Sequence, residues 1–240
     1  HYFKKYNAGK SVYSEQLFFK QALRLYGCWR STCTHRVVLA LTCWDLAFEY
    51  IPIDLTAREQ ETPEFRAISP DAQVPVLVVE DTILTQSLAI ISYLDSRRGD
   101  FGPSLFPSDP KDKARAIGIC ERVSSFVQPM TLPGGVRRAL KDHFETETGS
   151  AFDQRAEEFI QSMLNDNLRL LDRSIAPYAG PFALGETFTV ADIFVYPQLL
   201  GAQRLGFDLT PLPALSALAK QMETRADVRA ANPHLLPDAP

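Results

Sequence analysis

The sequence predicts a mixed α/β domain followed by an all-helical domain. Before residue 99, short apolar segments with strand and helix periods follow one another, which is typical of helices packed on a small sheet. After residue 110, almost every apolar pattern has the 3.6-residue period of a helix. Between them, residues 99–110 hold two glycines and three prolines, a composition that predicts a linker.

Composition excludes several classes of protein. The chain has 240 residues, of which 45% are hydrophobic and 22% charged, with a net charge of −4. This charge gives no reason to expect a nucleic-acid partner, and no apolar stretch reaches the ~20 residues of a membrane span. The first residues lack the apolar run of a secretory signal, and four cysteines are too few for a disulfide scaffold. We therefore expect a cytoplasmic protein.

In the first domain, apolar residues alternate over residues 23–27, which predicts a strand. Cys33, Val37, Ala40, Leu41 and Trp44 then recur on one face of a helix. Later apolar runs predict three more strands and a second helix, at residues 48–55, 74–79, 82–84 and 86–97. Pro52 favours an edge or a bulge for the second strand.

The second domain shows helical spacing throughout. One apolar face runs from Ile117 to Val127, and a longer one runs from Ala156 to Leu171. The segment Thr189-Val-Ala-Asp192 has the pattern of a capping box and predicts the start of another helix. Leu215, Leu218 and Met222 line a last helix, and the prolines at 233, 237 and 240 predict an extended tail beyond it.

The segment Trp29-Arg-Ser-Thr-Cys33 lies where the first strand meets the first helix. The first N–H groups of a helix lack internal partners and carry partial positive charge, so Ser31, Thr32 and Cys33 are candidates for holding an anion. The alternative is that Ser31 or Thr32 is simply a helix N-cap. A metal site is not expected, because the cysteines here lack a C-x-x-C pair or a histidine cluster.

The same segment differs from the Trp-Cys-x-x-Cys pattern of thioredoxin-type proteins. Arg30 stands in place of the first cysteine, and only Cys33 remains. Dithiol exchange needs both thiols, so this chemistry is not expected. A pocket for an external thiol remains as the interpretation.

Two further segments are candidates for binding. Pro75 lacks an N–H, and a proline at a strand start indicates a turn, a cis bond or an edge strand of no functional consequence. In the first two cases the backbone of Val74 is left to pair with a ligand. Gln86 and Ser87 open a helix after a hairpin, which makes a natural carboxylate site, although any helix needs a cap.

The order of these segments resembles the cytosolic glutathione transferases, most closely the zeta class of maleylacetoacetate isomerases. Their signature Ser-Ser-Cys followed by Arg-Val-Arg resembles residues 31–38, and residues 86–91, 189–198 and 207–211 are also similar. The resemblance covers residues 22–240. It implies an N-terminal extension at 1–20, a thioredoxin-like glutathione-binding domain at 21–98, a linker at 99–110 and an all-helical domain at 111–240.

The resemblance implies a glutathione site. Ser31 would donate a hydrogen bond to the glutathione sulfur, with Thr32 and Cys33 beside it in the catalytic segment. Val74 would pair its backbone with the cysteinyl part, next to a cis Pro75. Gln86 and Ser87 would hold the γ-glutamyl end.

The resemblance also implies cis–trans isomerisation of a diketo acid, in which the thiolate adds to the double bond, the bond rotates, and the thiol leaves. Arg30, Arg36 and Arg204 match three arginines that make the family's substrate site basic. From the residues alone, Arg36 could instead be a helix-surface charge and Arg204 a charge favoured at a helix C-terminus. The family also implies a homodimer.

Three departures from the family pattern lie at Thr32, at Val38 and in Met130–Gly135. The last of these lines the acceptor pocket in the family, so we expect a substrate that is either maleylacetoacetate-like or a related polyketide-type cis-enone. Two other functions stay open. One is a transferase that conjugates glutathione or removes halide, and the other is a non-catalytic binding module. Disulfide reduction through Cys33 is a further alternative.

Overall fold

The computed structural model describes residues 23–99, 102–131, 150–178 and 180–240. The chain forms two compact units. The first holds the described residues up to Leu105 together with Glu223–Pro240, and the second holds Phe106–Met222. The change of unit after Leu105 falls within the segment that the sequence predicts as a linker. The predicted extension at residues 1–20 lies outside the described residues.

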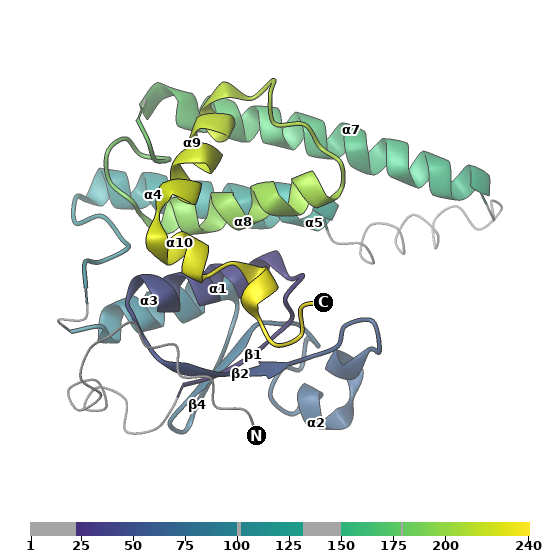
Figure 1. The fold of residues 1–240 in the computed structure, drawn as a ribbon, viewed down its shortest axis with the longest axis vertical. Coiled ribbons are helices and arrows are strands. Elements are labelled where there is room, and N and C mark those ends of the chain that lie inside the picture. The colour runs from purple at the N-terminus through teal and green to yellow at the C-terminus, as the bar shows by residue number, and fades with distance from the viewer. Residues whose placement is uncertain (1–22, 100–101, 132–149, 179) are drawn as a thin grey trace. The chain divides into compact units, whose positions relative to one another are not determined.

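A four-stranded mixed sheet forms the centre of the first unit (Figure 1), in the order β2-β1-β3-β4. Strand β1 (Leu23–Gly27) pairs in parallel with β2 (Phe48–Pro52) and antiparallel with β3 (Val76–Val79). Strand β4 (Thr82–Thr85) pairs antiparallel with β3 and forms an edge. The predicted strand at 74–79 begins two residues late, because Pro75 has no N–H to give to the ladder. The predicted strand at 48–55 ends three residues early, at Pro52.

Side-chain alternation along the strands gives the sheet two apolar faces. Figure 1 shows α1 (Thr32–Cys43) and α3 (Ser87–Arg97) along one face. On the other face, Phe65 of the short helix α2 (Pro63–Arg66) packs with Ile53, Val76 and Val78. Because successive residues of a strand point to opposite faces, Leu77 and Val79 belong to the side of α1 and α3, where they are fully buried.

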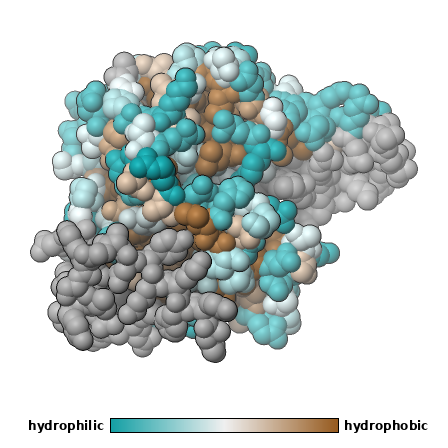
Figure 2. Space-filling model, in the orientation of Figure 1, coloured by the Kyte–Doolittle hydropathy of each residue, from teal (hydrophilic) through white to brown (hydrophobic). Residues whose placement is uncertain are grey.

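The second unit is helical, as the sequence predicts. Its helices are α4 (Pro110–Arg122), a π-helical segment at Val123–Val127, α5 (Gln128–Thr131), α7 (Ser150–Ile175), α8 (Val190–Arg204) and α9 (Pro213–Thr224). Figure 2 shows that hydrophilic residues cover much of the visible face of this unit, with apolar residues between them. Helix α8 is buried on nearly every side, which marks it as the centre of the unit. None of the described helices combines the length and the hydropathy that a membrane-spanning segment requires.

The expectation of an extended tail after the last long helix is wrong in part. Helix α10 (Ala226–Ala230) and a 3-10 turn at Pro233–Leu235 follow α9. Helix α10 packs against α1, so the end of the chain belongs to the first unit and not to a helical domain reaching residue 240. The three prolines do not prevent this, because Pro233 occupies the first turn of its helix, where a missing N–H costs nothing.

Candidate functional site

The register of the sheet brings the three predicted segments to one place. Tyr26 of β1 lies opposite Val76 of β3, which in turn lies opposite Thr85 of β4. The residues after β1, before β3 and after β4 therefore meet at the same end of the sheet. These are the segments Trp29–Cys33, Val74–Pro75 and Gln86–Ser87.

A tight turn joins β1 to α1. The Cys28 N–H donates to Thr34 Oγ1 at 3.3 Å, and the Ser31 N–H donates to the Cys28 carbonyl at 2.9 Å. A Cβ atom on Gly27 would collide with the Thr34 side chain, so only glycine allows the strand to approach the helix this closely. This turn fixes where Ser31 stands.

Ser31 is the N-cap of α1, so the structural alternative from the sequence is correct. Its Oγ accepts a hydrogen bond from the Thr34 N–H at 3.1 Å. A capping hydroxyl uses its oxygen as acceptor and keeps its own proton to donate. Because the first turn of α1 carries no acidic side chain, its partial positive charge is not neutralised there. The Ser31 hydroxyl can therefore cap the helix and donate a hydrogen bond to an anion at the same time.

The two neighbours of Ser31 differ in access. Thr32 is buried, with 9% of its surface exposed, whereas Cys33 is partly exposed in the first turn of α1. Cys33 is a free thiol, as are Cys28, Cys43 and Cys120. Of these two neighbours, only Cys33 is exposed enough to contact a ligand at the helix N-terminus.

The second and third segments have unusual backbones. The Val74–Pro75 bond is cis, which confirms the expectation for Pro75. Gln86 is exposed and has φ 67° and ψ 115°, a conformation that costs a non-glycine residue about 1–3 kcal/mol. Its carbonyl nevertheless accepts the Ile90 N–H of α3 at 3.0 Å. Ser87 then begins α3 and is buried.

Arg36 does not lie where the sequence analysis expects a substrate-binding arginine. Only 1% of its surface is exposed, and its Nη1 faces Ser87 Oγ at 3.4 Å. Burial prevents direct contact between this guanidinium and a substrate. Its charge instead lies beneath the N-terminus of α3, where it adds to the positive potential of the helix.

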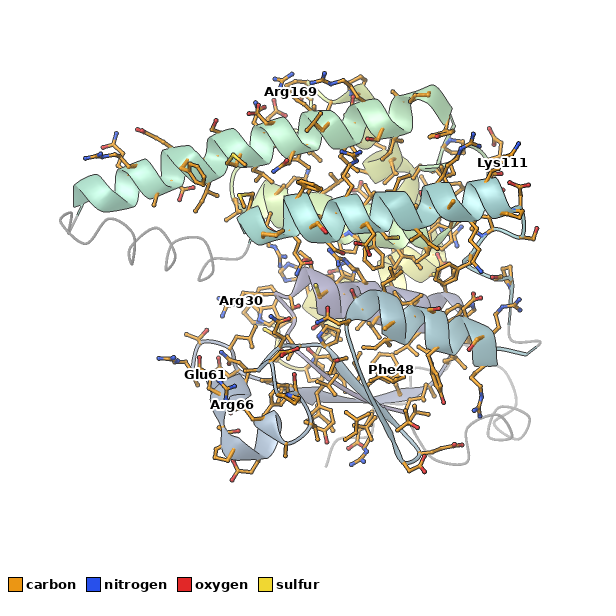
Figure 3. All side chains as sticks on the ribbon, turned by 180° about the vertical axis from the view of Figure 1, so that it is seen from behind. Arg30, Phe48, Glu61, Arg66, Lys111 and Arg169 are labelled. Atoms are coloured by element: carbon orange, nitrogen blue, oxygen red, sulfur yellow. The ribbon has the colours of Figure 1, made fainter. Side chains whose placement is uncertain are left out.

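Arg30 and Arg204 are both exposed. Arg30, labelled in Figure 3, donates through Nη2 to Thr56 Oγ1 at 2.6 Å, and its guanidinium lies 5.7 Å from the centre of the Trp29 ring. Arg204 ends α8 in the second unit. Of the departing segment Met130–Gly135, the structure describes Met130 and Thr131, at the end of α5, and the rest lies outside the described residues.

One residue at this site has no signal in the sequence. Asp238 accepts a hydrogen bond from the Trp29 N–H at 2.9 Å, although 209 positions separate the two residues. Nothing in the spacing or composition near residue 238 predicts this contact.

Elsewhere, no group of histidine, cysteine and acidic side chains that could hold a metal occurs in the described part of the chain.

Family models match both units. The N-terminal domain of glutathione S-transferases matches residues 21–96, and the C-terminal domain matches residues 137–230. Glutathione S-transferase Z2 of Arabidopsis thaliana is 32% identical over 224 residues, which span 93% of this chain and 96% of the relative.

Solved structures of glutathione-dependent isomerases also resemble this chain. Maleylacetoacetate isomerase of Anaeromyxobacter dehalogenans, with glutathione bound in its active site, is 36% identical with a TM-score of 0.78, covering 91% of this chain and 98% of that one. A maleyl pyruvate isomerase described as a bacterial zeta-class glutathione S-transferase is 26% identical with a TM-score of 0.81, covering 90% of this chain and 100% of that one. The chain thus belongs to the glutathione S-transferase family, and within it to the zeta class.

Proposed function

We propose that the protein is a glutathione-dependent cis–trans isomerase of a small acidic cis-enone, such as a maleylacetoacetate-like diketo acid. The observation that carries this proposal is the Ser31 hydroxyl, held at the uncompensated N-terminus of α1 with its proton left to donate. Related isomerases in the zeta class support the substrate class.

The residues of this site fit glutathione. Ser31 and the α1 N-terminus suit a thiolate, and the backbone of Val74 lies at the same end of the sheet to pair with a peptide group. The N-terminus of α3, with Ser87 as its first residue and Arg36 beneath, suits a carboxylate. A thiol, a peptide and a carboxylate occur together in glutathione, so we propose that Ser31, Val74, Pro75, Gln86 and Ser87 bind it.

Each part of the site has a role in the proposed reaction. Glutathione supplies a thiol sulfur that adds reversibly to the cis double bond and so permits rotation about it. Ser31 and the α1 N-terminus stabilise the charged sulfur and lower the pKa of the thiol. Arg30 and Arg204 are exposed cations that we assign to the acidic substrate, since charge develops on its oxygen atoms during the reaction.

A second candidate is a transferase that conjugates glutathione or removes halide, because the Arabidopsis relative is named as a transferase. The two functions share the glutathione residues and differ in product. Isomerisation returns free glutathione, whereas conjugation leaves it bound to the product.

The test is to follow a cis diketo acid such as maleylacetone by absorbance and mass spectrometry, with and without glutathione. We expect conversion to the trans acid that depends on glutathione and does not consume it. Ser31→Ala should lower kcat about 100-fold at neutral pH, because without this donor the pKa of the bound thiol rises and less of it is present as thiolate. Ser96→Ala, an exposed serine of α3, is the matched control and should keep the wild-type rate.

The outcomes separate the candidates. Consumption of glutathione into an adduct would favour the transferase. Absence of any glutathione-dependent reaction, with Ser31→Ala indistinguishable from wild type, would favour a non-catalytic module and contradict the proposal.

We further infer that the protein works in the cytoplasm as a homodimer. The described cysteines are free thiols, which is typical of proteins in a reducing compartment. Large apolar side chains left exposed on the fold support self-association.

A further inference from the structure

The end of the chain lies against the turn that carries Ser31. Asp238 Oδ2 accepts the Trp29 N–H at 2.9 Å, and the Tyr50 hydroxyl of β2 lies 3.4 Å from the same oxygen. The His234 ring also packs on the Trp29 ring, with their centres 5.1 Å apart. Two residues from the end of the chain thus contact the turn between β1 and α1, and one of them, Asp238, is also bonded to a neighbouring strand.

This end of the chain has its own anchor. Asp227, at the start of α10, pairs with Arg225 and hydrogen-bonds the Cys43 thiol at the end of α1. Burial, reinforced by Asp227, raises the pKa of the Cys43 thiol, which stays protonated as a donor. With α10 fixed on α1, residues 232–238 are directed along the first unit toward the other end of the same helix.

Hydrogen bonds to a carboxylate are stronger than those between neutral groups. Burial, and then the charge of Asp238, raise the pKa of the Tyr50 phenol, so it remains a donor to this carboxylate. Asp238 Oδ1 is buried with no hydrogen-bond partner among the described residues. The carboxylate is therefore held through Oδ2 alone, and its strongest protein contact is the amide of Trp29.

We propose that Asp238 is a positioning residue for the glutathione site. Its carboxylate fixes the Trp29 amide, and through it the turn at residues 28–31 that places the Ser31 hydroxyl. It acts through Trp29 and does not touch the sulfur. The proposal rests on the proposed function of Ser31, and one of its measurements is made without glutathione so that the two can fail separately.

The experiment compares three variants of the full chain. Asp238→Ala removes the acceptor, whereas Asp238→Asn keeps an acceptor oxygen and removes the charge. Asp109→Ala is the matched control, since Asp109 also accepts backbone N–H groups, at the N-terminus of α4 in the other unit. The readouts are kcat/KM for glutathione across pH, and hydrogen exchange over residues 28–31 in the absence of glutathione.

We expect Asp238→Ala to lower kcat/KM for glutathione about tenfold, to move its pH profile upward, and to speed exchange over residues 28–31. Asp238→Asn keeps a neutral, weaker acceptor and should fall between Asp238→Ala and wild type in kcat/KM and exchange. Asp109→Ala should lower the melting temperature and leave both readouts at wild-type values.

Wild-type exchange and kcat/KM in Asp238→Ala would overturn the proposal. So would an equal loss in Asp238→Asn, because the effect would then come from charge and not from position. If Asp238→Ala does not fold, Tyr50→Phe replaces it. This variant removes the second hydrogen bond that orients the carboxylate, so faster exchange with lower kcat/KM supports the proposal, and wild-type values of both overturn it. If the wild type shows no glutathione-dependent activity, the proposed function fails, and exchange alone decides the role of Asp238.

Discussion

Arg36 shows how a buried charge can serve a site that it does not touch. A guanidinium removed from water is costly unless it is paired and hydrogen-bonded. Here it lies beside Ser87 Oγ, beneath the helix end that we assign to the γ-glutamyl carboxylate. Its position makes it a source of positive potential for that carboxylate and a support for the orientation of Ser87.

We expect Arg36→Met to raise KM for glutathione about tenfold and to change kcat much less, because the lost charge acts on binding of the carboxylate end. Arg36→Lys keeps the charge but loses the planar guanidinium, so its KM for glutathione should lie between those of Arg36→Met and wild type. Initial rates at varied glutathione concentration measure this. Arg24→Met, at an exposed position of β1, is the matched control. A lower melting temperature with an unchanged KM would show that Arg36 only stabilises the fold.

Among the elements, α8 has a fully buried start. Thr189 and Asp192 form the capping box that the sequence predicts. The Asp192 carboxylate accepts the N–H groups of Thr189 and Ala183, each at 2.7 Å, and so ties the preceding loop to the helix. These hydrogen bonds lower the pKa of Asp192, but burial has the larger effect and raises it to about 6.

This pKa predicts a pH dependence of stability. Since the ordinary pKa is 3.8, the folded state binds a proton more readily than the unfolded state between about pH 4 and 6. The contribution of Asp192 is therefore fully present below about pH 4 and is lost as pH rises through about 6. We expect wild type to lose about 2 kcal/mol relative to Asp192→Asn between pH 4 and 7, measured by urea unfolding.

Asp109→Asn is the control for removing a cap carboxylate, because Asp109 is exposed at the start of α4. A free-energy difference between wild type and Asp192→Asn that stays constant from pH 4 to 7 would contradict this prediction. It would mean that the buried carboxylate keeps its ordinary pKa.

Elements with strong local signals could be predicted from the sequence. The alternation of β1, the apolar face of α1 and the capping box of α8 each depend on neighbouring residues alone. Helix α10 could not be predicted in this way, because it has one helical turn and its stability comes from packing against α1. The nearby prolines favour an extended tail by their local preference, which this packing overrides.

The candidate site was predictable for a related reason. Its three segments follow or precede strands, and strand pairing brings them to one end of the sheet. The burial of Arg36 and the arrival of Asp238 were not predictable, because both depend on tertiary contacts between distant segments. Sequence patterns thus named candidate residues, and strand pairing brings three of their segments to one end of the sheet.

Two exposed apolar side chains allow the proposed homodimer to be tested. Ile83, 47% exposed, lies on the edge strand β4, and Phe126, 56% exposed, lies in the π-helical segment after α4. Asn167 Nδ2 donates to the Phe126 carbonyl at 3.0 Å and so fixes the backbone there. An edge strand and an exposed phenylalanine are features that a partner surface would cover.

We expect the wild type to have the mass of a dimer in light scattering after size exclusion. Ile83→Asp and Phe126→Asp should each weaken association at least about tenfold, because each would bury a charge in an apolar contact. Leu170→Asp, at a 45% exposed leucine of α7, is the matched control and should leave the mass unchanged. A monomeric wild type would refute the homodimer. A dimer that both variants preserve would place the interface on another surface, since neither side chain would then be buried by association.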